Sequence, residues 1–131
     1  RIIMDWSYIS GFFDGEGNIH FNKIGNKSYQ LVCRLYSSNE TVLLEIKNFI
    51  GFGNIYRKKS TGLYELTISS KKNNFTFLKA IYTSSIIKKE LISFVLENYV
   101  FHDGNNNLGF DIAKFHSLIT RKNVDKFYRS E

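Results

Sequence analysis

Three glycines interrupt an apolar segment near the start of the chain, and they constrain the fold more than any other feature. The stretch from Trp6 to Phe13 has the apolar character of a helix, yet each interior helical glycine costs about 1 kcal/mol relative to alanine. Ser7, Gly11 and Gly15 are spaced four residues apart, so they form one stripe of small side chains along that helix. Because such a stripe lets a second helix approach very closely, the sequence predicts a tightly packed helix pair.

The end of this helix carries two carboxylates. Asp14 and Glu16 lie where the pattern predicts that the helix ends, and Gly17 suits a left-handed stop. Phe12 and Phe13 point away from the stripe, toward a core. We expect a structural role for Asp14, with some donor that stabilises its carboxylate against the negative end of the helix. Glu16 is then the carboxylate that the paired helices present at their ends.

The remaining patterns predict two consecutive helix–hairpin units. Alternating apolar and polar residues predict strands at 18–22, 28–36, 54–59 and 63–70, with turns at 25–27 and 60–62. A helix capped by Ser38 or Asn39 and ended by Gly51 and Gly53 separates the hairpins. Further helices are expected at 4–15, 74–82, 86–101 and 110–128. The apolar positions expected to face inward are Val42, Leu43, Ile46, Phe49 and Ile50 in the capped helix, and Ile87, Leu91, Phe94 and Val95 in the 86–101 helix.

The order α-β-β-α-β-β-α-α predicts a single α+β domain over residues 1–131, with a four-stranded antiparallel sheet covered by helices on one face. The bare face is expected to carry side chains that read base edges in a major groove, and an ordinary solvated face is the alternative. These residues are His20, Asn22, Gln30, Arg34, Tyr36, Tyr56, Lys58, Glu65, Thr67 and Ser69. Flanking cations suit phosphate contacts: Lys23, Lys27, Arg57, Lys59, Lys71 and Lys72.

Composition agrees with a nucleic-acid partner. The net charge of +6 indicates a polyanionic ligand, and no apolar run reaches membrane-spanning length. The single cysteine, Cys33, fits a reducing compartment and predicts a buried structural thiol. The absence of proline and the abundance of Ile, Asn, Lys, Phe and Tyr indicate an AT-rich gene. The expected location is intracellular: a mitochondrion, a chloroplast or the cytoplasm of an AT-rich microbe.

Residues 9–17, Ile-Ser-Gly-Phe-Phe-Asp-Gly-Glu-Gly, closely resemble the signature motif of the LAGLIDADG homing endonucleases. GFGNIY at 51–56 resembles the approach to the second hairpin of that family, and SIIKK at 85–89 resembles its segment with a basic active-site residue. The resemblance covers roughly residues 5–100. Ser10 departs from the usual small apolar residue, and Glu16 stands where aspartate is commoner.

The resemblance implies a sequence-specific DNA endonuclease that hydrolyses both strands with a divalent metal at the ends of two motif helices. Because the chain holds one motif, it implies a homodimer with a near-palindromic target. The implied interface residues are Ser7, Ser10, Gly11, Asp14 and Gly15. A nine-residue strand spans ~30 Å, so each protomer would follow ~8–9 base pairs and the dimer ~16–20. The sheet is then a DNA-binding saddle.

The resemblance also implies the composition of the active site. Glu16 and the Gly15 carbonyl would bind Mg²⁺ or another hard divalent cation. Lys88 would organise water or stabilise developing charge, with an ordinary surface lysine as the alternative. Ser37, Ser38 and Asn39 are candidates for a further polar catalytic residue, of which Ser37 is preferred because Asn39 suits the helix cap. Glu65 would support this network or contact a base.

Two alternatives share the same fold: an RNA maturase that helps an intron splice, and a DNA-binding protein that does not cut. A structural protein without affinity for nucleic acid is a third class, which the charge and the polar hairpins disfavour.

Overall fold

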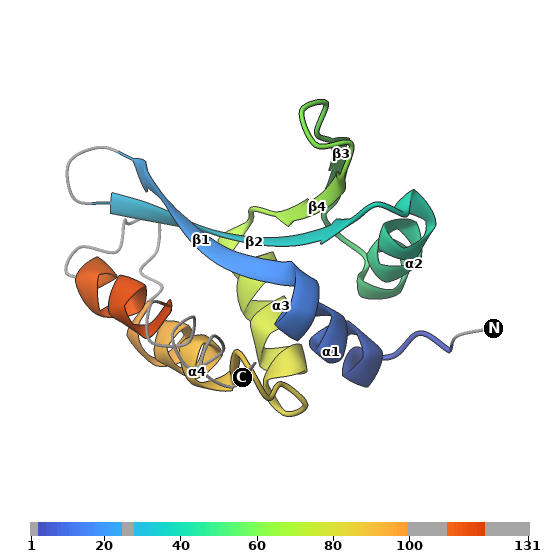
Figure 1. Cartoon of the computed structure of the whole chain (residues 1–131). Helices are drawn as coiled ribbons and strands as arrows, with labels where there is room; N and C mark the ends of the chain where they lie inside the picture. Colours follow the sequence, from blue (N-terminus) through green and yellow to red (C-terminus); the bar gives the residue numbers. More distant parts are fainter. Residues whose placement is uncertain (1–2, 25–27, 100–109, 120–131) are drawn as a thin grey trace, which may run out of the picture.

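The computed structural model describes residues 3–24, 28–99 and 110–119, which form a four-stranded antiparallel sheet with helices on one side (Figure 1). The elements are α1 (Trp6–Glu16), β1 (Gly17–Ile24), β2 (Ser28–Ser37), α2 (Glu40–Ile50), β3 (Asn54–Arg57), β4 (Tyr64–Ile68), α3 (Lys71–Tyr82) and α4 (Lys89–Asn98), and residues 112–119 are also helical. The sheet order is β1-β2-β4-β3. The predicted α+β architecture is confirmed, and none of the described elements covers the other sheet face, which we call the bare face.

Local signals set the element boundaries. Asn39 caps α2, because its side chain accepts a hydrogen bond from the Thr41 N–H at 2.9 Å. Gly51 ends this helix in the left-handed region, with φ of 88°. Ser70 caps α3 through the Asn73 N–H, so the helix begins three residues earlier than the predicted 74. The predicted turn at 25–27, which includes Lys27, lies outside the described residues.

Gly17 does not have the left-handed conformation that the sequence predicts. Its backbone is extended, with φ of −108° and ψ of 167°, because the chain passes directly from α1 into β1. Glycine is required here by close approach, since a Cβ atom at this position would clash with the ring of Phe13. The motif helix and the first strand therefore pack tightly at their junction.

The core lies between the helices and the covered face of the sheet. Its fully buried members include Ile9, Phe13, Leu31, Cys33, Leu35, Leu43, Ile46, Leu66, Phe77, Leu78 and Val95. Burial raises the pKa of the Cys33 thiol, as expected for an inert structural cysteine. Two predicted core positions are wrong: Phe49 is 42% exposed at the end of α2, and Ile87 is 48% exposed because α4 begins after it.

A buried asparagine completes the hydrogen bonds of β2 where β4 has ended. β4 ends at Ile68, which lies opposite Cys33. The part of β2 from Ser28 to Val32 therefore has no β4 residue beside it. The Cys33 N–H donates to Asn74 Oδ1 at 3.2 Å, and Asn74 Nδ2 donates to the carbonyls of Leu31 and Ser70 at 2.9 and 3.0 Å. A buried backbone group without a partner costs about 1–3 kcal/mol, so this amide stabilises the sheet in place of a strand.

Candidate active site and nucleic-acid interface

The glycine stripe of α1 is exposed on the surface of the chain. Ile9 and Phe13 are fully buried on one side of the helix, whereas Ser7, Gly11 and Gly15 are exposed on another. A Cβ atom built at Gly11 or Gly15 would meet no other atom within 4 Å. Packing among the described residues therefore gives no reason for glycine at these two positions, in contrast to Gly17.

Ser10 and Asp14, which the family resemblance placed at the dimer interface together with this stripe, are enclosed by their own chain. Ser10 is fully buried, and its hydroxyl donates to the Ile81 carbonyl at 2.9 Å. Asp14 is only 8% exposed and is covered by residues 85–88. Both side chains connect α1 to the end of α3 and to the residues just before α4. Because they are buried within the chain, neither belongs to the exposed stripe that a partner could contact.

Four donors from one segment surround the Asp14 carboxylate. Oδ1 accepts from the Ser85 hydroxyl at 2.6 Å and from the Lys88 N–H at 3.2 Å. Oδ2 accepts from the N–H groups of Ile86 and Ile87 at 2.7 and 3.2 Å. These are the donors that the sequence required for a carboxylate at a helix C-terminus. The helix α4 begins at Lys89 rather than at the predicted 86, and the three residues before it give their backbone N–H groups to this carboxylate.

The side chain of Lys88 also contacts α1. Its Nζ donates to the Asp14 carbonyl at 2.6 Å and lies 5.7 Å from the centre of the Phe13 ring. The Asp14 carboxylate thus binds the backbone before α4, while the Lys88 ammonium binds the backbone near the end of α1. These contacts hold the Lys88 ammonium at the carbonyl of Asp14, which is two residues before Glu16 in the sequence.

Burial raises the pKa of the Asp14 carboxyl, but the hydrogen bonds from Ile86, Ser85, Ile87 and Lys88 outweigh it and hold the pKa below its ordinary value. A group whose pKa is lower in the folded state stabilises the fold above its unfolded pKa, about 3.9 for aspartate. That contribution is lost as the pH falls through the folded pKa.

We expect Asp14→Asn to lower the free energy of unfolding by about 2–3 kcal/mol at neutral pH, because an amide replaces an acceptor that faces backbone N–H groups. The difference from the wild type should shrink below pH ~4. Urea unfolding at several pH values measures this. Asp5→Asn is the matched control, since Asp5 caps α1 through the Tyr8 N–H and asparagine caps equally well. Equal losses in both variants would contradict the expectation.

A pocket of about 320 Å³ brings the end of the motif helix together with the end of β2. Its lining includes Glu16, Ser37 and Ser38, with Phe12, Tyr36 and Leu63. Asn39 serves as the α2 cap instead, and its N–H donates to the Ser37 hydroxyl at 3.0 Å. The serines, rather than Asn39, therefore lie beside Glu16.

One chain alone supplies few ligands for a metal. Glu16 is exposed at the end of α1, directly after Gly15. The described residues contain no group of three or more His, Cys, Asp or Glu side chains that converge on one point. A carboxylate and a carbonyl oxygen are donors that fit a hard divalent cation, which takes six or more oxygen ligands in all.

The bare sheet face carries most of the polar side chains that the sequence assigned to it, whereas Lys58 and Ser69 lie just beyond the ends of β3 and β4. The registers place Asn22 opposite Gln30, Arg34 opposite Thr67, and both Tyr36 and Tyr56 opposite Glu65. By alternation along the strands, His20 lies on the same face. Asn18 lies opposite Arg34, and Asn54 lies opposite Thr67. The sequence did not assign these two asparagines to the face, although the alternation extends to them.

Several contacts organise this face. Arg34 Nε lies 3.4 Å from Glu65 Oε2, and the Thr67 hydroxyl donates to the same oxygen at 2.7 Å. Near the pocket, Asn18 Nδ2 donates to the Tyr36 hydroxyl at 3.4 Å. Lys58 Nζ lies 5.9 Å from the centre of the Tyr36 ring.

Among the predicted flanking cations, Lys71 and Lys72 lie in the first turn of α3, and the other described ones lie on or next to the strands. Lys58 and Lys59 are exposed on the β3–β4 hairpin, and Lys23 is exposed near the end of β1. Arg57 lies opposite Tyr64 in the register, and its guanidinium carbon is 5.7 Å from the centre of that ring. The alternation of β3 therefore directs Arg57 away from the face that carries Tyr56 and Glu65, although it remains exposed.

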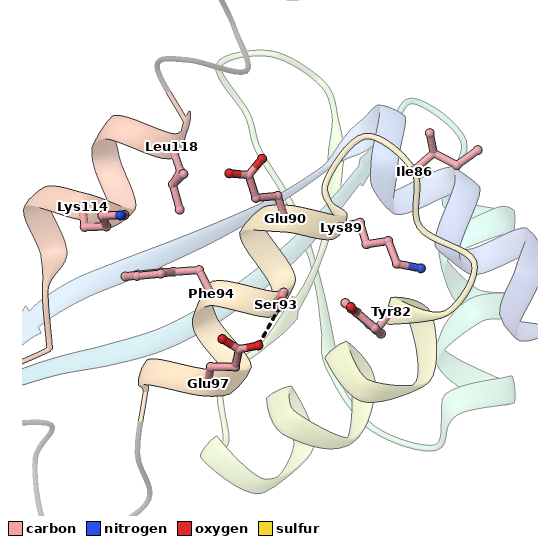
Figure 2. A pocket seen from close by; sticks show the side chains of 9 residues that line it. All are labelled: Tyr82, Ile86, Lys89, Glu90, Ser93, Phe94, Glu97, Lys114 and Leu118. Atoms are coloured by element: carbon pink, nitrogen blue, oxygen red, sulfur yellow. Dashed lines mark hydrogen bonds between the residues drawn. The ribbon is translucent and has the colours of Figure 1, made fainter.

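A second pocket, of about 500 Å³, lies among the helices (Figure 2). Its lining residues are Tyr82, Ile86, Lys89, Glu90, Ser93, Phe94, Glu97, Lys114 and Leu118. These include carboxylates and ammonium groups in equal number, and Glu97 already accepts a hydrogen bond from Ser93 at 3.1 Å. Because α4 lies on the helical side of the sheet, this pocket is separate from the bare face (Figure 1).

No helix within the described ranges has the length and apolar character needed to span a membrane.

Comparisons with solved structures identify the fold. The homing endonuclease I-CvuI, in complex with the I-CreI target, aligns with a TM-score of 0.64 at 17% identity, covering 70% of this chain. The chain spans 63% of the length of that I-CvuI chain. The archaeal intron-encoded homing endonuclease I-Vdi141I, complexed with DNA, aligns with a TM-score of 0.57 at 18% identity, covering 91% of this chain and 96% of its own.

A search of curated proteins found no match. The sequence model of the LAGLIDADG endonucleases matches residues 9–96, which include the motif helix, both hairpins and the segment with Lys88. The match extends over more than half of the chain. This chain therefore belongs to the LAGLIDADG endonuclease family.

Proposed function

We propose that this protein is a homodimeric, site-specific DNA endonuclease, which hydrolyses both strands of its target with a divalent metal at the dimer axis. The observation that carries the proposal is the exposed stripe of Ser7, Gly11 and Gly15, which ends at the exposed Glu16. Glycine at two exposed helical positions destabilises the isolated chain, and close approach of a second helix supplies the reason for it.

A two-fold axis along this stripe brings the ends of two α1 helices together. Because an isologous interface uses the same surface twice, each Glu16 would meet its counterpart near the axis. Two carboxylates repel each other unless cations lie between them. The second chain thus supplies the additional ligands that one chain lacks.

Mg²⁺ or a similar hard cation is the expected cofactor, held by Glu16 and the Gly15 carbonyl together with phosphate oxygens and water. I-CvuI structures determined with Mg and with Ca support the use of divalent ions in the family. When bound, the cation would polarise the phosphate and activate water. Lys88 would stabilise negative charge that develops at the phosphate, and the Ser37 hydroxyl would orient water in the pocket shared with Glu16.

The bare sheet face is the proposed DNA-binding surface. Its side chains are hydrogen-bonding groups suited to base edges, and exposed lysines border it. DNA complexes of structural neighbours support a duplex partner. The expected target is near-palindromic, because both halves of a symmetric dimer would read the same sequence. An intracellular location, with organelles among the candidates, remains an expectation from composition.

Selection from a library of randomised palindromic duplexes tests the proposal, with double-strand cuts scored in the presence of Mg²⁺. We expect cuts at one defined sequence. Specific binding of DNA without cuts under any divalent ion would favour a DNA-binding protein, and tight binding of intron RNA with no DNA binding would favour a maturase. Either result would contradict the nuclease proposal.

We expect affinity for the selected duplex to fall by about 10³–10⁵ between 50 and 200 mM salt, if six to ten phosphates are contacted. Each phosphate that Lys or Arg neutralises releases counterions, and salt opposes that release. Fluorescence anisotropy measured across this range gives the slope. An affinity that is independent of salt would contradict a binding surface bordered by lysines.

A further inference from the structure

Arg34 occupies the middle of the bare sheet face. Its register partners are Asn18 on β1 and Thr67 on β4, and Thr67 in turn lies opposite Asn54 on β3. These four residues form one row across all four strands, and Arg34 is the charged member of that row. A duplex that lies along this face would pass over the Arg34 side chain.

A carboxylate accompanies this arginine. Glu65 Oε2 lies 3.4 Å from Arg34 Nε and accepts the hydrogen bond of the Thr67 hydroxyl at 2.7 Å. The two charged side chains are 24% and 13% exposed. A carboxylate on a surface that faces phosphates is repelled by them, and a partly exposed ion pair contributes little to stability. The presence of Glu65 on this face therefore requires another reason.

We infer that Arg34 specifies a guanine in each half of the DNA target, and that Glu65 is the positioning residue that orients its guanidinium. The inference rests on the proposed function. Arginine recognises guanine by donating two hydrogen bonds to O6 and N7, which requires a fixed orientation. A chain of contacts would fix the orientation of the guanidinium. The Thr67 hydroxyl donates to the Glu65 carboxylate, and this carboxylate pairs with Nε of Arg34. The Nη groups of Arg34 are then free to donate to the base.

A phosphate contact would not need this arrangement. Exposed lysines such as Lys58 and Lys59 provide positive charge without a fixed geometry, as phosphate binding allows. Arg34 instead lies at the centre of the face, partly buried and paired through one edge of its guanidinium. That geometry suits bidentate recognition of one base.

Binding selection tests the inference in the absence of divalent metal, so that no cleavage is needed. The wild-type protein is expected to prefer guanine at one position of each half-site by about ten- to hundredfold. Arg34→Gln should move the preference at that position to adenine, because a glutamine amide pairs with adenine N6 and N7. Glu65→Gln should keep guanine with about tenfold weaker discrimination. Lys59→Ala is the control, expected to weaken all duplexes equally.

Thermal melting of each variant accompanies the selection. If Arg34→Gln does not fold, Arg34→Ala replaces it, and this variant is expected to bind DNA with the guanine preference lost, because alanine has no donor for guanine O6 and N7. A defined target with unchanged base preferences in the Arg34 variants would overturn the inference and leave the proposed function standing. A Glu65→Gln variant that changes a different base pair would overturn the positioning role. Failure of the wild type to bind any duplex would overturn both proposals.

Discussion

Glu16→Gln is expected to slow Mg²⁺-dependent DNA cleavage by at least about a thousandfold, while target affinity stays within a few fold. A divalent cation contributes several kcal/mol of transition-state stabilisation, and each 1.36 kcal/mol is a factor of ten in rate. Glutamine keeps the size of the side chain but removes the charge that holds the cation. Glu16 is exposed and stands at the end of α1, so the substitution leaves the core untouched.

Single-turnover cleavage and anisotropy binding, measured on the same duplex, separate the two effects. Glu45→Gln is the matched control, because Glu45 is also an exposed helical glutamate but lies in α2. The control should cleave at the wild-type rate. Equal cleavage by Glu16→Gln and wild type would remove this residue from the active site.

The second large effect is expected at the interface. Gly11→Leu should convert the dimer into monomers and abolish cleavage. Overpacking at a close contact costs about 1–3 kcal/mol, and the two-fold axis doubles this cost, so the dissociation constant should rise at least about thirtyfold. The isolated chain should tolerate the change, because a Cβ at Gly11 meets no atom within 4 Å and leucine is the better helix former.

Light scattering after size exclusion reports the mass, and thermal melting reports the fold. Thr76→Leu is the matched control, since Thr76 is an exposed helical position of α3 and does not belong to the stripe on α1. The control should remain a dimer. A Gly11→Leu protein that elutes as a dimer with unchanged cleavage would show that the stripe is not the interface.

The sequence predicted what short-range patterns determine. The period-two alternation identified the bare sheet face, because a strand places every second side chain on one side. The cap at Asn39 and the stop at Gly51 were confirmed for the same reason, since each depends on its immediate neighbours. The spacing of Gly11 and Gly15 likewise predicted that they share one stripe, which is exposed on the single chain, and the tightly packed helix pair stays a prediction.

The predictions were wrong where a residue's surroundings depend on a segment that is distant in the sequence. Ser10 and Asp14 belong to the motif, and helical spacing gives their direction but not what covers them. The segment at 85–88 lies more than 70 residues away in sequence, yet it encloses Asp14. The helix α4 also begins at Lys89, later than the apolar spacing of Ile87 and Leu91 had placed it. Periodicity alone does not show which donors a distant segment brings to a side chain.

The amide of Asn74 has a consequence for solubility. An unpaired stretch of strand invites other chains to add their own strands, which is a common route to aggregation. The Asn74 side chain from α3 occupies the Cys33 N–H and the Leu31 carbonyl in that stretch of β2, so these two groups do not serve as a template for another strand. The protein can thus keep a strand longer than its neighbour β4, and such length lets a sheet follow a duplex without promoting self-association along its edge.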